Sequence, residues 1–194
     1  MSTKEDERCR LLELPGKLRN RIYRDALVLG PGLEIPVKAT GYNTEGLMRT
    51  CKTIRNETTS LFYCENHFAV EVWDYDPTAL IRFTAILSSL GFSSLGSDNA
   101  KMHIEGDVKS KKPSWPNFLR LLQGIHEDKV IRIPSTPAAG LERGGQSLED
   151  MVVAGLVVLV MQTRDLSWTR VRDLLREQRP VLGRIDAAWM EEDV

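Results

Sequence analysis

Residues 68–73 read Phe-Ala-Val-Glu-Val-Trp, an alternating pattern rich in β-forming side chains that is typical of a strand. The alternation returns in residues 101–105, Lys-Met-His-Ile-Glu, and residues 130–133, Val-Ile-Arg-Ile, form a third candidate strand. Helical patterns lie between the strands, near residues 76–89 and 114–125. This strand–helix–strand–helix–strand order favours right-handed crossovers and parallel pairing. The expected fold class is therefore α+β, with a small, mainly parallel sheet.

Apolar side chains at helical spacing predict two helices before the first of these strands. Leu14-Pro15 opens the first helix, since proline lacks the N–H that would be unpaired in the first turn. Residues 30–32, Gly-Pro-Gly, end it, and residues 33–37 are a short extended candidate. The second helix is expected to begin near Thr44. The apolar face of the first helix comprises Leu18, Ile22, Ala26 and Leu29, and that of the second Leu47, Cys51 (expected to be a small core residue), Ile54, Thr58 and Leu61.

The last part of the chain predicts a helical cover over the sheet. Residues 151–161 are uninterrupted by any polar side chain, and Ser147 before them is a typical N-cap. Because the apolar side chains lie on all sides of this helix, we expect it to be the central core helix, with the strands on one side. Gly155 would then mark a close approach of a neighbour. Ser167 and Pro180 are expected to start two further helices, each containing a tryptophan.

The composition is that of a globular protein and excludes several classes. The 194 residues are 42% hydrophobic and 27% charged, and a net charge of −1 disfavours a strongly basic nucleic-acid-binding protein. Three cysteines without Cys-x-x-Cys spacing indicate neither a disulfide scaffold nor a zinc site, and they fit a reducing compartment. The first ten residues hold no apolar signal segment, and the longest apolar run is shorter than the roughly 20 residues of a membrane span. We therefore expect a cytoplasmic or nuclear protein that binds no membrane.

Motifs for catalysis, metal binding and cofactor binding are absent from the sequence. The histidines lack metal-ligand spacing, and neither a phosphate-binding glycine loop nor a nucleophile elbow occurs. Cys64, three residues before His67, is the remaining alternative for a reactive thiol. Arg49, Lys52 and Arg55 are interpreted as a solvated helix face, since no aromatic residues lie between them. We expect no enzyme activity, no cofactor, no metal and no nucleic-acid partner.

Blocks at both ends of the chain resemble F-box-like proteins. Residues 11–27, Leu-Leu-Glu-Leu-Pro-Gly-Lys-Leu-Arg-Asn-Arg-Ile-Tyr-Arg-Asp-Ala-Leu, resemble the start of an F-box, where Leu-Pro opens a helix. Residues 47–57, Leu-Met-Arg-Thr-Cys-Lys-Thr-Ile-Arg-Asn-Glu, and 61–68, Leu-Phe-Tyr-Cys-Glu-Asn-His-Phe, resemble the second block of a large group of fungal F-box-like proteins. The segments 167–168, Ser-Trp, and 185–189, Ile-Asp-Ala-Ala-Trp, are similar to their C-terminal ends.

This resemblance implies a protein that recognises other proteins and carries out no catalysis. The N-terminal helices would dock onto a Skp-type adaptor of a cullin–RING ubiquitin ligase, and the rest of the chain would bind a target. Carried over by position, the adaptor-facing residues are Leu14, Pro15, Leu18, Ile22 and Leu27.

The expected organisation is an F-box-like helical region at 11–65 and a strand–helix region at 66–194, packed as a single domain. The strand spacing is similar to that of short leucine-rich-repeat-like units, although the repeat consensus is absent. Residues 30–46 depart from the usual F-box pattern, so the first helix could pack its apolar positions into the chain's own core instead. Two alternatives stay open: a standalone interaction or scaffold domain that binds no adaptor, and an enzyme of unrecognised class.

Overall fold

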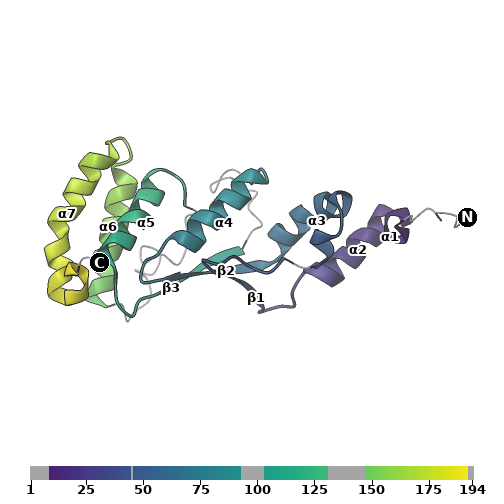
Figure 1. The fold of residues 1–194 in the computed structure, drawn as a ribbon, viewed down its shortest axis with the longest axis horizontal. Coiled ribbons are helices and arrows are strands. Elements are labelled where there is room, and N and C mark those ends of the chain that lie inside the picture. Colours follow the sequence, from purple (N-terminus) through teal and green to yellow (C-terminus); the bar gives the residue numbers. More distant parts are fainter. Residues whose placement is uncertain (1–8, 45, 93–102, 131–146, 192–194) are drawn as a thin grey trace, which may run out of the picture. The chain divides into compact units, whose positions relative to one another are not determined.

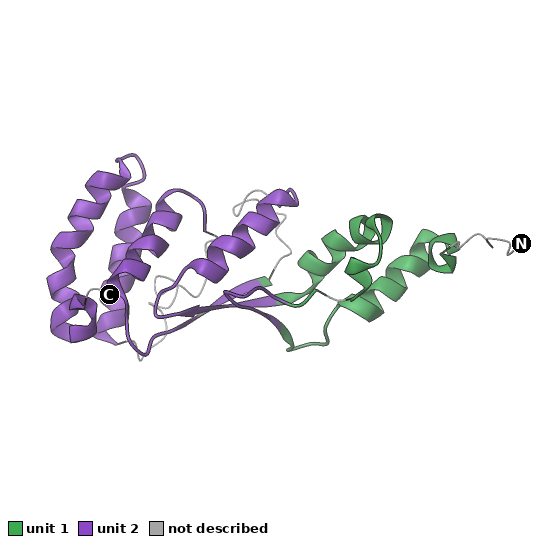
Figure 2. Ribbon diagram, viewed as in Figure 1, with its two compact units in different colours: residues 1–34, 43–67, 101–103 green, residues 35–42, 68–100, 104–194 purple. Residues whose placement is uncertain are grey.

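The computed structural model describes residues 9–44, 46–92, 103–130 and 147–191. Figure 1 labels its helices and strands, and Figure 2 colours the two compact units into which the chain divides. Unit 1 comprises residues 1–34, 43–67 and 101–103, and unit 2 comprises residues 35–42, 68–100 and 104–194.

Unit 1 is built around a pair of packed helices. The short α1 (Arg10–Glu13) leads into α2 (Gly16–Leu27), which begins directly after the Leu-Pro signal. A 3-10 turn, η1 (Gly46–Arg49), precedes α3 (Lys52–Glu65), and α3 packs against both α2 and η1. The buried apolar side chains of this unit are Tyr23, Leu27, Met48, Ile54, Phe62 and Tyr63.

The start of α3 differs from the sequence expectation at Cys51. The helix begins at Lys52 rather than near Thr44, because Cys51 has extended backbone (φ −148°, ψ 166°) and is the N-cap residue. Its Sγ accepts a hydrogen bond from the Ile54 N–H at 3.5 Å, and the residue is exposed. The prediction of Cys51 as a core residue is therefore wrong: its thiol satisfies an otherwise unpaired N–H of the first helical turn.

Three strands of the described residues form one sheet in the order β1 (Glu34–Val37), β2 (His67–Trp73) and β3 (His103–Lys109). The first residues of β2 and β3 stack their imidazole rings. At the other end, the N–H of Asp74 donates to the carbonyl of Lys109 at 2.8 Å. The first residues of β2 and β3 are therefore neighbours, and so are the residues at their other ends. The two strands run parallel. The expected α+β class with a small, mostly parallel sheet is confirmed.

The strand positions follow the sequence pattern with one shift. The extended candidate at 33–37 is β1, and the alternation at 68–73 is β2. The strand expected at 101–105 begins at His103 and continues to Lys109. The strand expected at 130–133 lies outside the described residues, except for Val130, which is buried.

One face of β2 belongs to the core of unit 2 and the other faces outward. α4 (Thr78–Ser89) and α5 (Trp115–His126) lie on the same side of the strands in Figure 1. Phe83 of α4 has its ring centroid 5.2 Å from that of Phe68. Trp73, at the end of β2, points to the outward face and is exposed. The side chains of β2 buried in the core are Phe68, Val70 and Val72.

The C-terminal cover consists of α6 (Leu148–Gln162), α7 (Trp168–Ile185) and the 3-10 turn η3 (Ala187–Met190). A capping box starts α6, in which Ser147 and Asp150 exchange side-chain to backbone hydrogen bonds. α6 packs against α5 and α7. The buried aromatic cluster of unit 2 consists of Tyr75, Trp115, Phe118 and Trp189.

Three expectations about these helices are wrong: the close approach at Gly155, the central place of α6 and the helix start at Pro180. α6 buries the side that carries Leu156, whereas Met151 and Gly155 are exposed, and a Cβ built on Gly155 would meet no described atom within 4 Å apart from its chain neighbours and the backbone of its own helix. Its main packing partners are α5 and α7, so α6 is not a central helix with the strands on one side. Pro180 lies inside α7 instead of starting a new helix. Pro180 removes one backbone hydrogen bond from the helix, and Leu182 just beyond it is fully buried.

Candidate interaction surface

The orientation of α2 on α3 is fixed by a polar network around Glu57. The Arg19 guanidinium donates to both carboxylate oxygens of Glu57, from Nε at 3.0 Å and from Nη2 at 2.9 Å. The Tyr23 hydroxyl donates to Glu57 Oε2 at 2.8 Å. Arg19 also donates from Nη1 to the carbonyl of Leu14 at 2.7 Å. One guanidinium thus ties together α3, α2 and the segment before α2, in the bidentate geometry that gives arginine–carboxylate pairs their directionality.

The ionisation of this network favours its hydrogen bonds at neutral pH. The hydrogen bond from Tyr23, followed by the one from Arg19, lowers the pKa of Glu57. Burial raises the pKa of Tyr23, and the hydrogen bond to Glu57 adds to that rise. The hydrogen bond to Glu57 also raises the pKa of Arg19. The carboxylate is therefore charged while the hydroxyl and the guanidinium keep their protons, so all donors and acceptors match.

The end of α2 is held by a second set of polar contacts. Arg24 and Glu65 form another bidentate pair, with Nε–Oε2 and Nη2–Oε1 distances of 2.8 Å and 2.9 Å. Asn66 is buried, and its Nδ2 donates to the Leu27 carbonyl at 2.8 Å and to a carbonyl in the last turns of α3 at 3.0 Å. Its Oδ1 accepts the Leu29 N–H at 2.8 Å. The amide thus pairs backbone groups that the end of α2 would otherwise leave unsatisfied.

These contacts leave one apolar side of α2 facing outward. Leu18 is 51% exposed and Ile22 is 40% exposed, one helical turn apart. Ala26 is exposed another turn along the helix, and Leu29, just after it, is 36% exposed. We call Leu18, Ile22, Ala26 and Leu29 the α2 stripe. Aliphatic side chains gathered on the outside of a fixed helix are typical of a surface that binds another protein.

The five residues expected to face an adaptor do not all lie on this side. Leu18 and Ile22 belong to the α2 stripe, and Pro15 is exposed. Leu14 is half-buried. Leu27 is only 1% exposed, because it lies one turn beyond the buried tyrosine of α2 and shares its inward face. Its side chain is part of the core of unit 1 and does not contribute to the surface.

The residues that orient α2 were missed by the sequence reasoning. Three of them, Glu57, Glu65 and Asn66, lie in blocks 47–57 and 61–68, which carry the F-box-like resemblance. Their place in these blocks is the one sequence feature that could have identified them. Arg19 and Glu57 are separated by 38 positions. A single sequence with many arginines and glutamates does not indicate which of them will pair.

The pair His67 and His103 and the candidate thiol singled out in the sequence lie at separate places in unit 1. In the described part of the chain, no group of three or more His, Cys, Asp or Glu residues could hold a metal ion. His67 and His103 are exposed, and their rings stack with centroids 4.3 Å apart and planes 9° apart. The Sγ of Cys64, the thiol considered as reactive, lies 3.9 Å from the Ser60 hydroxyl of its own helix.

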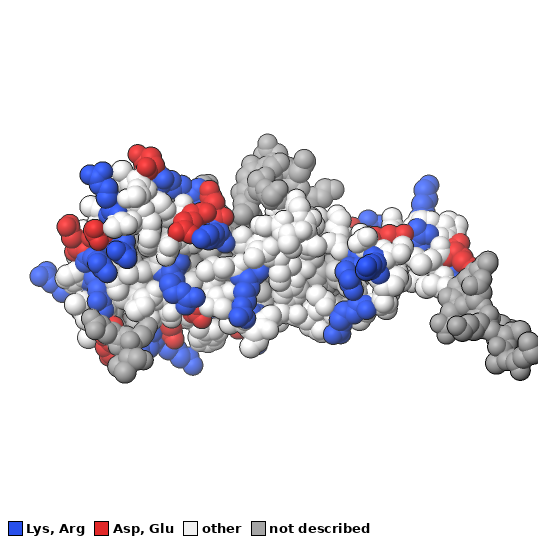
Figure 3. Space-filling view, turned by 45° about the horizontal axis from the view of Figure 1, so that its top comes forward, with Lys and Arg blue, Asp and Glu red and all other residues white. Residues whose placement is uncertain are grey.

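The basic residues before and within α3 are exposed, as a solvated helix face requires. Arg49 and Lys52 are exposed, and Arg55 donates from Nε to the Met48 carbonyl at 3.0 Å. In Figure 3, lysine and arginine are interspersed with aspartate and glutamate over the helices of unit 2 at the left of the view.

Among the helices of the described residues, none combines the length and the apolar character needed to cross a membrane. No family model, no curated protein and no solved structure matches the chain.

Proposed function

We propose that the chain is a non-catalytic protein-recognition module and that the α2 stripe is the surface to which its partner binds. The observation that supports this most directly is a row of exposed aliphatic side chains on a helix that Glu57 and Asn66 hold in place. One exposed leucine means little, since folded proteins expose much apolar surface. A row at one-turn spacing is different, because a complementary partner removes all of it from water at once, without any cost of ordering the helix.

The partner proposed for this surface is a Skp-type adaptor of a cullin–RING ubiquitin ligase. The basis is the resemblance of residues 11–27 and 47–68 to fungal F-box-like proteins, together with the exposure of Leu18 and Ile22, two of the positions carried over from that family. Unit 2 would then bind the protein to be ubiquitinated, and the location would be cytoplasmic or nuclear. The alternative is a scaffold domain that uses the same stripe for a different protein.

A double variant, Leu18→Asp with Ile22→Asp, tests this proposal. Both side chains are exposed, so the variant should fold, whereas a carboxylate buried in an interface without a partner costs several kcal/mol. We expect the affinity for a purified Skp-type adaptor, measured by isothermal titration calorimetry, to fall by about 100-fold or more. Leu33→Asp is the matched control, because Leu33 is 59% exposed in unit 1 but lies outside α2.

The outcomes separate the two forms of the proposal. Equal adaptor binding by the double variant and the control would show that the α2 stripe is not the binding surface. No binding of the adaptor by the wild-type chain would exclude the ligase role. A protein captured from extract by the wild type and by Leu33→Asp, but not by the double variant, would then support the scaffold alternative.

A further inference from the structure

Two histidines lie side by side where β2 and β3 begin. His67 is the first residue of β2 and His103 is the first residue of β3. Their imidazole rings stack, with centroids 4.3 Å apart and planes 9° apart, and both side chains are exposed. The two residues are far apart in the sequence, so the pairing of the strands is what brings them together. We call His67 and His103 the histidine pair.

The backbone on both sides of the histidine pair is held by buried neighbours. Asn66, directly before His67, is buried, and its side-chain amide bonds to the backbone of three other residues. Phe68 and Ile104, which directly follow the two histidines, are also buried. The strands that carry them are hydrogen-bonded to each other. The two imidazoles are therefore attached to fixed positions, and only their own side-chain torsions are free to change.

The ring nitrogens of the histidine pair are not used by other groups of the described residues. Neither ring takes part in a hydrogen bond or an ion pair there, and each ring stacks on the other. The third histidine is different: the Nε2 of His126 lies 3.1 Å from the Leu166 carbonyl, and its ring centroid lies 5.6 Å from that of Trp168. The nitrogens of His67 and His103 are therefore available to a ligand.

The ligand that two neighbouring imidazoles suit best is a late first-row metal ion. Neutral imidazole binds Ni²⁺, Cu²⁺ and Zn²⁺, whereas Mg²⁺ and Ca²⁺ prefer oxygen ligands. A closed zinc site takes four protein ligands, and no group of three or more His, Cys, Asp or Glu of the described residues could hold a metal. Two nitrogens with water in the remaining positions are instead typical of Cu²⁺ or Ni²⁺ in tetragonal geometry.

The stacked rings must tilt toward each other before both can bind one ion. Because their planes are only 9° apart, the nitrogen lone pairs lie in nearly parallel planes and do not meet at one point. An ion at about 2.0–2.1 Å from each nitrogen places the two nitrogens about 3 Å apart. The ring centroids are 4.3 Å apart, so the required approach is small. Exposed imidazoles rotate about the Cβ–Cγ bond at little cost, and the tilt is therefore accessible.

We propose that the histidine pair binds one divalent metal ion of the Cu²⁺ or Ni²⁺ type, through one nitrogen of each ring and with water in the other positions. The bound ion links the first residue of β2 to the first residue of β3. A proton competes with the metal for the same ring nitrogen, so the affinity falls as the solution becomes acidic. The histidine pair shares no residue with the α2 stripe, so the inference does not rest on the proposed function.

The test is isothermal titration calorimetry of the full chain with Ni²⁺. Ni²⁺ is the probe because Cu²⁺ oxidises free thiols, and Cys9 and Cys51 are exposed. We expect one ion per chain. His67→Gln and His103→Gln should each raise the Kd about 100-fold, since either change removes the advantage of two linked ligands. The double variant should bind about as weakly as each single variant, because the first change already removes the chelate.

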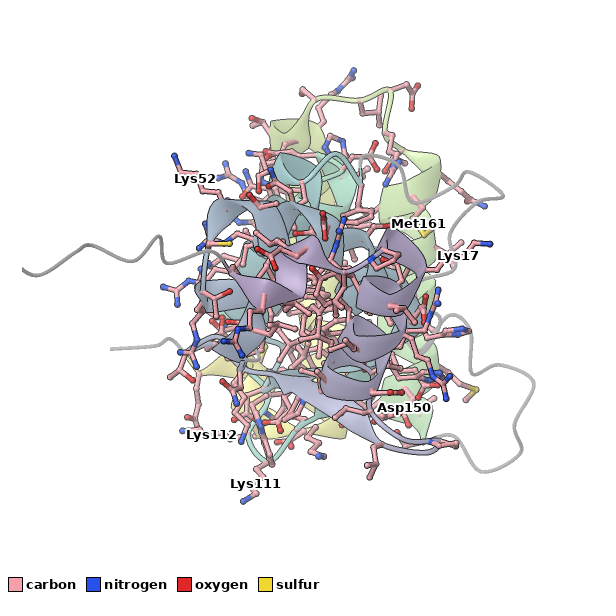
Figure 4. The ribbon with its side chains drawn as sticks, turned by 90° about the vertical axis from the view of Figure 1, so that its right-hand side faces the viewer. Lys17, Lys52, Lys111, Lys112, Asp150 and Met161 are labelled. Carbon is pink, nitrogen blue, oxygen red and sulfur yellow. The ribbon has the colours of Figure 1, made fainter. Side chains whose placement is uncertain are left out.

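Three control variants separate the histidine pair from other metal ligands. His126→Gln should keep the wild-type Kd. Lys17→His combined with His67→Gln restores the number of exposed histidines without restoring the pair, so its Kd should stay at that of His67→Gln. Lys17 is exposed on α2 and projects away from the chain in Figure 4. Cys9→Ser with Cys51→Ser removes both exposed thiols, keeps an N-cap side chain on α3, and should bind as the wild type does.

Four results would overturn the inference. The first is no binding of Ni²⁺ by the wild type. The second is an unchanged Kd in the single glutamine variants, with or without fewer ions bound, because the histidines would then act independently or not at all. The third is recovery of tight binding by Lys17→His in the His67→Gln chain, which would mean that any exposed imidazole suffices. The fourth is a loss in the cysteine variant equal to that in His67→Gln, because thiolates would then be the ligands.

Discussion

Units 1 and 2 hold their helices together in different ways. In unit 1 the position of α2 depends on directional polar contacts of Arg19, Glu57 and Asn66. In unit 2 the helices meet on aromatic side chains, where the rings of Phe118 and Trp189 lie 5.4 Å apart and are fully buried. Each hydrogen bond contributes little net free energy, but its geometry fixes the orientation of the two groups. Burial of a large aromatic ring contributes more free energy and depends less on orientation.

This difference explains how unit 1 can expose an apolar stripe. A small helical unit buries a smaller share of its surface than a larger one, so apolar burial alone would hold α2 weakly. The contacts around Glu57 and Asn66 orient α2 without using the side that carries Leu18 and Ile22. Unit 1 therefore presents a helix of defined orientation.

The largest effect is expected from a charge in the core of unit 2. Leu156 is 6% exposed on the inward side of α6, so Leu156→Asp buries a carboxylate without a partner. We expect the free energy of unfolding in urea to fall by about 3–5 kcal/mol, a large share of a typical total of about 5–15 kcal/mol. Met151→Asp is the control on the same helix, where the side chain is 47% exposed and the loss should stay below about 1 kcal/mol. Equal losses would mean that both sides of α6 are buried.

The next effect concerns the amide that holds the end of α2. Asn66→Ala leaves the Leu27 carbonyl and the Leu29 N–H without their partner. Unsatisfied buried groups cost about 1–3 kcal/mol each, so we expect a loss of about 2–3 kcal/mol in urea unfolding. Asn56→Ala, at an exposed position of α3, should change stability by less than about 0.5 kcal/mol. A similarly small loss for Asn66→Ala would show that unit 1 does not depend on polar contacts.

Two helical glycines in unit 2 should respond with opposite sign. A Cβ on Gly124 of α5 would overlap the buried side chain of Val130, so Gly124→Ala is expected to destabilise by about 1–3 kcal/mol. Gly155 of α6 is exposed with open space around it, so Gly155→Ala is expected to stabilise by about 0.5–1 kcal/mol through helix propensity. The Tm of each variant, measured by thermal unfolding and compared with that of the wild type, gives the sign of the stability change. If Gly155→Ala destabilised the protein, a neighbour would have to approach Gly155 closely, as the sequence suggested.

Local signals were sufficient for most elements of the fold. The alternation of residues 68–73 and the Leu-Pro before α2 each depend on near neighbours in sequence, and both elements form where expected. The predictions for Cys51 and Pro180 were wrong. Cys51 is the N-cap residue of α3, and α7 continues through Pro180; neither feature can be recognised from the neighbouring residues in the sequence. The close approach was assigned to Gly155 instead of to a glycine in α5, since only packing distinguishes one helical glycine from another.

The candidate surface was predictable only as a periodic pattern. Helical spacing places Leu18 and Ile22 on one side of α2, and both are exposed. The same spacing does not say which side faces the core, so Leu27 was included although it is buried. The arginine–glutamate and asparagine contacts that decide this orientation join residues far apart in sequence. Pairing Arg19 with Glu57 requires the folded arrangement of α2 and α3.

The smallest effect should come from the pH dependence of the Glu57 contacts. Hydrogen bonds from Tyr23 and Arg19 lower the pKa of Glu57 from its ordinary value of 4.5, so the stability it contributes is full above pH 4.5 and is lost as the pH falls through the folded value. Tyr23 acts in the opposite direction: its pKa is raised from 10, so its contribution is lost only as the pH rises above that range. Glu57→Gln should therefore lower the Tm slightly at neutral pH, by an amount that shrinks below pH 4.5. Glu177→Gln, at an exposed carboxylate of α7, is the control variant. A Tm difference between Glu57→Gln and the wild type that persists unchanged into acid would mean that the charge of Glu57 does not hold α2 on α3.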